Sequence, residues 1–393
     1  MIGRRKVTLS REGWYYLFVL TFILGGALFR EVNLLLMLSA MMVGPLIFSW
    51  RIAAGTLRRL SVERKAPSLC HAGEPTMIEL AVHNQRSWLP SWMLTATDVI
   101  DQVAETTVLF DKLPAGETRQ QPYRITFAVR GRHRYSHVRL ITRYPFGFVK
   151  AAIDVACDGE QIVAPALGQL TQLGQSLISG GKARQRTAKR RGAQQAEYYG
   201  IRDWRSGDSR RWIHWRSSAK SGELAVLQFH EQQDDELALL LDLWQPSAAR
   251  PSERAAVELA VSVAATMIVA AARQRGRRLV VCVLGEQSQC WRDSASPPLV
   301  QHLLEHLAEV RGTERGELPA ASLEQLWQQQ PGRVMVISTR SQADFSTIVT
   351  PQVELGRTQA LLSDWLGHQE VRWLDVTAPA LDQFFRPPAG AEA

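Results

Sequence analysis

The densest group of side chains that could do chemistry in this 393-residue chain lies between Glu197 and Glu231. Arginines, tryptophans and aspartates are interleaved there around His214, and the pairs Gly207-Asp208 and Gly222-Glu223 indicate turns. Guanidinium groups bind carboxylates as planar forks and stack on indole rings, so this mixture indicates a fixed polar lattice. Such a lattice could form a binding or catalytic site, or it could lock parts of the structure together.

A catalytic role would require an acid–base pair and a nucleophile. Asp203, Asp208 and His214 could exchange protons while the arginines hold an anion. However, no spacing identifies a base for Ser217 or Ser218, so we assign no catalytic residue. We favour a structural or partner-binding role, and an enzyme or small-anion site at this cluster stays open as the alternative.

The order of residues in this segment resembles the signature of domain-of-unknown-function family 58, a family of bacterial proteins. The residues to which we assign the structural or partner-binding role are Glu197, Arg202, Trp204, Gly207, Asp208, Arg211, His214, Trp215, Gly222 and Phe229. An earlier block, from Arg130 to Gly147, is similar to another part of the same family. The resemblance implies a von Willebrand type A-like C-terminal domain. It also implies a partnership with a MoxR-type AAA+ ATPase in the assembly or maturation of other proteins.

The net charge of +8 is concentrated in two places, the first 65 residues and residues 182–220. The second region begins with an almost purely basic run that predicts an exposed loop, and its cations are Lys182, Arg184, Arg186, Lys189, Arg190 and Arg191. This loop could be merely solvated, or it could contact anionic lipids or an acidic partner. Nucleic acid is the less favoured ligand, because the rest of the chain is acidic on balance.

Two uncharged runs, Gly13–Phe29 and Leu34–Trp50, predict a transmembrane helical hairpin within residues 1–56. Arginines precede the first run and follow the second, so the positive-inside rule places both flanks and all later residues in the cytoplasm. A cleaved signal peptide is the rival interpretation, but it would not need a second apolar run directly after it. The sequence therefore predicts a bacterial inner-membrane protein with two helices, cytoplasmic soluble domains and the lipid bilayer as a partner.

The remaining chain predicts two folded domains joined by the signature segment. Residues 57–165 alternate apolar and polar side chains between turn signals, which is typical of an antiparallel β-sandwich. Residues 166–235 hold the basic loop and the signature. Residues 236–393 alternate buried strands with helices, which predicts an α/β domain with a doubly wound parallel sheet.

The sequence gives no reason to expect a metal or another cofactor. A metal-binding type A domain has Asp-x-Ser-x-Ser after its first strand, but here Asp242 is followed by Trp244 and Pro246 at the serine positions. The cysteines, at positions 70, 157, 282 and 290, are scattered, which favours buried free thiols over a disulfide. We therefore expect a non-enzymatic, membrane-anchored scaffold or adaptor, and the sequence does not indicate its oligomeric state.

Overall fold

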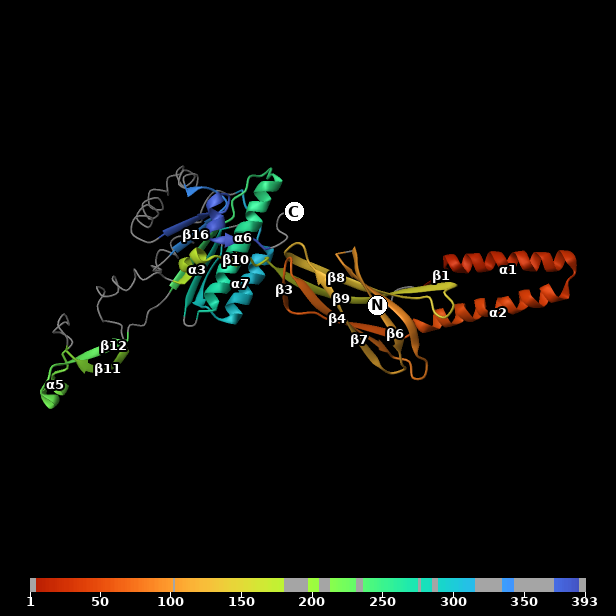
Figure 1. Ribbon diagram of the computed structural model, residues 1–393, viewed down its shortest axis with the longest axis horizontal. Helices are drawn as coiled ribbons and strands as arrows, with labels where there is room; N and C mark the ends of the chain where they lie inside the picture. Colours follow the sequence, from red (N-terminus) through yellow and green to blue (C-terminus); the bar gives the residue numbers. More distant parts are fainter. Residues whose placement is uncertain are drawn as a thin grey trace. The chain divides into compact units, whose positions relative to one another are not determined.

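The computed structural model describes residues 5–101, 103–179, 197–204, 213–230, 236–274, 277–284, 289–314, 334–342 and 371–388 (Figure 1). The described residues form two compact units: residues up to Ala166 together with Leu304–Glu309 make up the first, and Leu167–Leu303 with Val310–Pro388 make up the second. The first unit holds a helical hairpin and two β-sheets. The second holds an α/β sheet and a small two-stranded hairpin.

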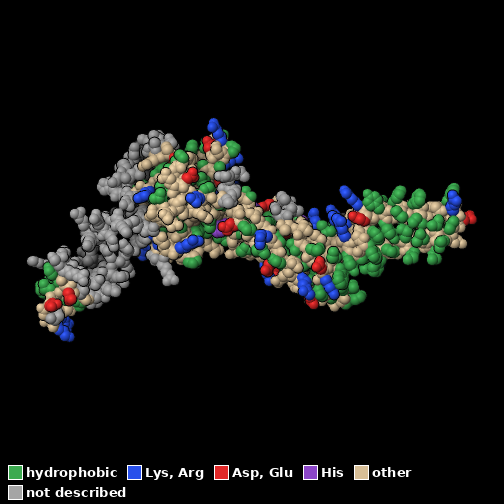
Figure 2. Space-filling view, in the orientation of Figure 1, with side chains coloured by type: hydrophobic (Ala, Val, Ile, Leu, Met, Phe, Trp, Pro, Cys, Tyr) green, Lys and Arg blue, Asp and Glu red, His purple; other side chains and the backbone are tan. Residues whose placement is uncertain are grey.

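The two apolar runs form the helices α1 (Arg11–Arg30) and α2 (Asn33–Thr56), which confirms the predicted pair of apolar N-terminal helices. Only 17% of the most apolar window of α1 and 11% of that of α2 are buried within the protein. Figure 2 shows hydrophobic side chains covering the visible face of both helices. Helices that leave so much apolar surface uncovered require an apolar solvent, so the hairpin indicates a membrane protein.

Helix α6 (Pro251–Ala272) is also long and apolar enough to cross a membrane, but its surroundings differ. Inside the protein, 61% of its most apolar window is buried, and the helix packs against strands of the α/β sheet. Burial against protein indicates a core helix.

The β-sheets of the first unit enclose one hydrophobic core. Nine strands contribute: β1 (Lys6–Leu9), β2 (Leu60–Lys65), β3 (Leu69–His71), β4 (Pro75–Asn84), β5 (Ser91–Ile100), β6 (Val103–Leu113), β7 (Thr118–Thr126), β8 (Gly131–Thr142) and β9 (Val149–Ala164). One sheet has the order β1-β9-β8-β5-β6, with β3 also beside β9, and the other has the order β2-β4-β7. All neighbours are antiparallel except β3 and β9. The predicted β-rich body of antiparallel sheets is therefore confirmed.

The C-terminal end of α2 is tied to the β-sheets by three donors. Arg5 Nη1 donates to Ala54 O at 3.0 Å, and Arg86 Nη1 donates to Gly55 O at 3.0 Å. Ser91 Oγ donates to Thr56 O at 2.9 Å. The last carbonyls of a helix lack intrahelical partners and carry partial negative charge, so these donors satisfy them and fix the helix end.

The α/β sheet has the strand order β15-β14-β13-β16-β17. Its strands are β13 (Glu236–Asp242), β14 (Arg278–Leu284), β15 (Gln289–Ser294), β16 (Val334–Ser338) and β17 (Val371–Asp375), and helix α7 (Pro297–Glu309) follows β15. The strands β14, β13, β16 and β17 are parallel, as expected, whereas β15 is an antiparallel edge strand that the sequence did not reveal. Half-exposed, charged side chains give β15 no apolar run to recognise.

The expectation of free thiols throughout was wrong for one cysteine pair. The antiparallel register of β14 and β15 places Cys282 opposite Cys290, and the two form a disulfide. Their separation of 8 residues in the sequence gives no C-x-x-C signal, so only the strand pairing brings them together. Cys70 and Cys157 are free, as predicted.

The second unit also contains short elements. Strands β10 (Gln169–Leu170) and β18 (Phe385–Arg386) pair, and helix α3 (Gln172–Ser179) and the 3-10 helix η2 (Pro379–Gln383) adjoin them. The signature segment supplies β11 (Glu197–Asp203), helix α5 (Trp215–Ser221) and β12 (Ala225–His230).

Candidate functional site

The signature segment folds as an antiparallel hairpin with a short helix. β11 pairs with β12, and the register places Glu197 opposite His230 and Arg202 opposite Val226. Phe229 lies opposite Tyr198 in the same ladder. Ile213 bridges to the same Val226, so β12 runs between β11 and the chain that enters α5.

His214 and Gly222 begin and end helix α5. Nδ1 of His214 accepts a hydrogen bond from the backbone N–H of Ser217 at 3.3 Å, so the imidazole serves as an N-cap. Gly222 has a φ of +78°, the left-handed conformation that glycine adopts without steric cost, and its N–H donates to Ser218 O at 3.0 Å. Both residues therefore have structural reasons to occupy these positions.

The sequence identified no base for Ser217 or Ser218, but the structure places one beside Ser217. Ser217 Oγ lies 2.9 Å from His214 Nδ1, so a base does lie within hydrogen-bond reach of this hydroxyl. Ser218 Oγ instead bonds His214 O at 3.1 Å and accepts from the N–H of Ala225 at 2.9 Å. Ser218 thereby joins the helix to β12, whereas Ser217 is the only one of the two near a base.

Four apolar side chains of this hairpin are exposed to solvent. Trp215 is 68% exposed and Trp204 is 37% exposed, and Ile201 and Leu224 are exposed by 41% and 44%. These residues, named here the aromatic patch, leave apolar surface uncovered on a small structural element. Exposed groups of this kind are typical of surfaces that contact another molecule.

Part of the predicted site lies outside the described residues. Gly207, Asp208 and Arg211 belong to this part, and so does every residue of the basic loop, namely Lys182, Arg184, Arg186, Lys189, Arg190 and Arg191. For Glu197 and Arg202 the structure gives the backbone position in β11, and for Phe229 it gives the backbone position in β12. The arginine–carboxylate lattice expected here stays a prediction.

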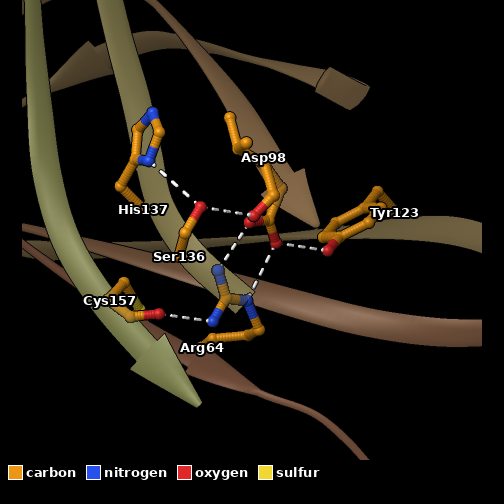
Figure 3. A network of polar contacts seen from close by, with 7 residues as sticks. Arg64, Asp98, Tyr123, Ser136, His137 and Cys157 are labelled. Atoms are coloured by element: carbon orange, nitrogen blue, oxygen red, sulfur yellow. Dashed lines mark hydrogen bonds and ion pairs between the residues drawn. The ribbon is translucent and has the colours of Figure 1, made fainter. Parts of the chain in front are cut away.

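An arginine–carboxylate lattice does occur in the core of the β-sandwich, where the sequence did not predict it. Arg64 on β2 donates from Nε to Asp98 Oδ2 on β5 at 2.8 Å, and its Nη2 bonds Oδ1 (Figure 3). Tyr123 on β7 donates its hydroxyl to Asp98 Oδ2 at 2.6 Å. Arg64 also donates to Cys157 O at 2.7 Å and lies 3.9 Å from the centre of the Tyr135 ring. These contacts join the two sheets, and we name them the sandwich cluster.

Burial sets the electrostatics of the sandwich cluster. Asp98 is completely buried and the Arg64 side chain is 5% exposed. Burial, followed by the hydrogen bond to Asp98, raises the pKa of Tyr123 far above its ordinary value. Burial alone would lower the pKa of Arg64, but the bonds to the Asp98 carboxylate outweigh it and raise that pKa.

The sandwich cluster is suited to holding sheets together rather than to catalysis. Both carboxylate oxygens of Asp98 already accept hydrogen bonds, and its burial gives a substrate no access. A buried pair of this kind constrains which partners can pack opposite each other. Asp98 could have been suspected only as a lone acid in an otherwise uncharged strand, a weak signal.

A second buried arginine–aspartate pair lies at the carboxyl edge of the α/β sheet. Asp242 ends β13, and Arg340 follows β16 and donates to both carboxylate oxygens, at 2.9 and 3.2 Å. Ser338 Oγ donates to the same carboxylate at 2.8 Å, and the guanidinium lies 5.6 Å from the centre of the Trp244 ring. We name this group the edge cluster.

The edge cluster lies where α/β sheets commonly bind ligands. The chain moves outward from β13 to β14 and β15, then resumes on the other side of β13 with β16 and β17. Ligands typically bind at the carboxyl ends of strands where the winding reverses in this way. Here the guanidinium of Arg340 covers the Asp242 carboxylate, which is the position that would otherwise be offered to a cation. Among the described residues, no group of three or more His, Cys, Asp or Glu is arranged to hold a metal.

Comparisons with known proteins match part of the chain to one family model. Residues 200–353 match the model of the family described as "Protein of unknown function DUF58". No curated protein matches the chain. Among solved structures, the chain is similar to a CARDB domain from Pyrococcus furiosus, determined once in solution and once as a crystal in complex with di-metal ions. Both are 16% identical with a TM-score of 0.19, and the matches cover 25% of this chain and 94% and 91% of those chains.

The matched region includes most of the signature from which the resemblance was inferred, together with the edge cluster. The assignment made from the motif is thereby confirmed: residues 200–353 carry the domain of unknown function of family 58.

Proposed function

We propose that this protein is a membrane-anchored adaptor that binds another protein through the aromatic patch. The single observation that carries this proposal is the exposure of Trp204, Trp215, Ile201 and Leu224 on one small hairpin. Tryptophan is enriched among the residues that dominate protein–protein binding energy, because it buries a large area with little loss of conformational freedom.

The resemblance to the family supplies the class of partner. We propose a MoxR-type AAA+ ATPase, acting with this protein in the assembly or maturation of other proteins. The structure supports an adaptor over an enzyme in one respect: the three buried carboxylates of the described residues, Asp98, Asp242 and Glu236, are each paired with an arginine.

Affinity capture from membranes tests the proposal. The full-length protein is solubilised in detergent with and without an ATP analogue, and its co-purifying proteins are identified by mass spectrometry. We expect an AAA+ ATPase with the wild type, and about a thirtyfold loss of affinity after Trp204→Ala or Trp215→Ala, since truncating a central aromatic anchor costs about 2 kcal/mol or more. A Trp88→Ala variant is the matched control, because Trp88 is 78% exposed but lies before β5 in the first unit. Equal recovery with all variants would remove the aromatic patch as the binding surface.

We also propose that the protein is anchored in the bacterial inner membrane with its soluble part in the cytoplasm. The arginines flanking α1 and α2 support this orientation. The Cys282–Cys290 disulfide is an argument against it, because disulfides are rare in the cytosol. Alkaline phosphatase fused after residue 60 separates the two: an inactive fusion supports the cytoplasmic side, and an active one excludes it.

For the α/β domain, we propose a von Willebrand type A-like fold whose ion site has been replaced. Support comes from the position of Asp242 at the end of the central strand and from the arginine that binds its carboxylate. In such a domain Arg340 would supply the positive charge that a divalent ion supplies elsewhere.

One observation favours an enzyme as a second candidate. The distance of 2.9 Å between Ser217 Oγ and His214 Nδ1 is compatible with a hydroxyl nucleophile and its base. Ser217→Ala would then abolish function in cells while leaving capture of the partner unchanged. Full function of Ser217→Ala would exclude this candidate.

A further inference from the structure

A cleft on the outer face of the six-stranded sheet has no role in the function proposed above. Its volume is about 470 Å³, and it lies within the first unit, between the exposed sides of β5, β6, β8 and β9. Apolar side chains of Met93, Leu109 and Ile141 form part of its wall. Arg143 and Lys150 also line it.

The cleft lies at the level where helix α1 begins. Its wall includes Gly147, whose carbonyl oxygen is 2.5 Å from the hydroxyl of Ser10, the N-cap of α1. The contact is close, because a Cβ added to Gly13 in the first turn would lie only 2.1 Å from Phe148 O. That clash would be with a backbone atom, so no change of side-chain conformation could relieve it. The first turn of α1 therefore packs directly against the backbone of residues 147 and 148 at the cleft.

Aromatic contacts extend this attachment into the hairpin. Phe148 stacks on Tyr16 of α1 with ring centres 4.2 Å apart, and Phe146 lies 6.4 Å from the ring of Phe48 on α2. Phe146 is itself 53% exposed. Aromatic rings gather at the boundary between hydrocarbon and water in membrane proteins. If α1 and α2 span a membrane, the cleft faces the headgroup layer of the adjacent leaflet.

The two cations of the cleft are available to a ligand. Neither Arg143 nor Lys150 has a hydrogen bond or a close ion pair from its side chain to any residue that the structure describes. Glu12, in the first turn of α1, interacts electrostatically with Arg143 but does not form a contact ion pair with it. Opposite these cations, Met93 and Leu109 are 48% and 49% exposed, which is an unfavourable state for large apolar side chains in water.

We propose that this cleft binds one anionic phospholipid of the surrounding bilayer. The phosphate would lie between Arg143 and Lys150, and the first carbons of the acyl chains would cover Met93, Leu109 and Ile141. Cations and apolar walls in one cleft match a molecule that joins a phosphate to hydrocarbon. A free phosphate would leave the apolar wall exposed, and the cationic headgroup of a zwitterionic lipid would repel Arg143 and Lys150. This proposal depends on the membrane hairpin and not on the aromatic patch or its partner.

Lipid retention by the full-length protein tests the proposal. The protein is reconstituted in phosphatidylcholine nanodiscs with a minor share of phosphatidylglycerol, and the lipids that stay bound after release into detergent are counted by native mass spectrometry. We expect one retained phosphatidylglycerol, and about a thirtyfold loss of retention in R143Q/K150Q, because the two cations near a membrane surface together contribute about 2 kcal/mol. Leu109→Asn should also weaken retention while leaving both cations in place.

The control removes two cations from the other sheet. Arg124 and Lys65 are exposed on β7 and β2, so R124Q/K65Q changes the net charge equally without altering the cleft. We expect this control to retain lipid as the wild type does. Equal retention by R143Q/K150Q and the wild type would overturn the proposal. Displacement of the lipid by an equal concentration of inorganic phosphate would overturn it too, since the cleft would then be a site for free anions.

Discussion

The two buried arginine–aspartate pairs have the same chemistry but lie in different kinds of place. Arg64 and Asp98 meet between two sheets, with a tyrosine hydroxyl on the carboxylate and a tyrosine ring under the guanidinium. Arg340 and Asp242 meet at the carboxyl edge of a parallel sheet, with a serine hydroxyl on the carboxylate and Trp244 near the guanidinium. In both pairs a charge that would be costly to bury alone is paired and hydrogen-bonded.

Location decides what each pair can mean. The sandwich cluster lies in the core and can only hold sheets in register. The edge cluster lies where α/β sheets commonly offer a carboxylate to a ligand. In this protein the guanidinium of Arg340 already binds that carboxylate. A similar contact is therefore structural in the first unit. In the second unit we propose that it replaces an ion-binding site.

The largest effect is expected when the sandwich cluster loses its acid. Asp98→Ala leaves the guanidinium of Arg64 buried without its carboxylate, which should lower the free energy of unfolding by about 3–5 kcal/mol. Denaturant unfolding of the detergent-solubilised protein measures this loss. Asp98→Asn, which keeps the shape and one acceptor, should cost less. A loss below about 1 kcal/mol for Asp98→Ala would contradict the assignment of this cluster to the core.

Breaking the edge cluster should cost somewhat less. Arg340→Ala is expected to lower the free energy of unfolding by about 3 kcal/mol, the lower end of the range for buried pairs, because water can reach an edge more readily than a core. The double variant Asp242→Leu with Arg340→Met should recover most of that loss, since no charge is then left unpaired. A double variant no more stable than the single one would show that the pair is needed for the fold itself.

High pH should weaken the sandwich cluster selectively. The pKa of Tyr123 is raised in the folded protein, so above about pH 10 the unfolded chain releases a proton that the folded protein keeps. The free energy of unfolding should therefore fall as pH rises, by up to about 1.4 kcal/mol per pH unit for this group. Tyr123→Phe removes this contribution, and an unchanged slope in that variant would mean that other groups cause the fall.

The smallest effect on stability is expected at the aromatic patch. Trp215 is mostly exposed, so Trp215→Ala should change the free energy of unfolding by no more than about 0.5 kcal/mol. The same denaturant unfolding measures it. A loss similar to that of the buried pairs would indicate that Trp215 packs against other parts of the protein, and the patch would then be no free surface.

Much of the fold followed from local patterns. The unbroken apolar runs identified α1 and α2, and strict alternation identified the sandwich strands, because each pattern has one favourable way to bury its apolar side chains. Strand β15 was missed because an edge strand with half-exposed side chains has no such pattern. The Cys282–Cys290 bond was missed with it, since their proximity exists only through the pairing of β14 with β15.

The chemistry of the sites was less predictable than the fold. Sequence proximity drew attention to His214 and its neighbours, yet the structure uses that imidazole to cap a helix. Arg64 and Asp98 are 34 residues apart, and Asp242 and Arg340 are 98 apart, so no local pattern could have paired them. Such contacts become visible only when the sheets are assembled.

Site-specific photocrosslinking tests the central claim most directly. A photoreactive residue replaces Trp215 in the full-length protein, cells are irradiated, and the adducts are identified by mass spectrometry. A photoreactive residue at Trp88 serves as the exposed control in the first unit. The adaptor proposal predicts a protein adduct, an AAA+ ATPase, from position 215 and not from position 88. The absence of any protein adduct from position 215, or the same adducts from both positions, would contradict it.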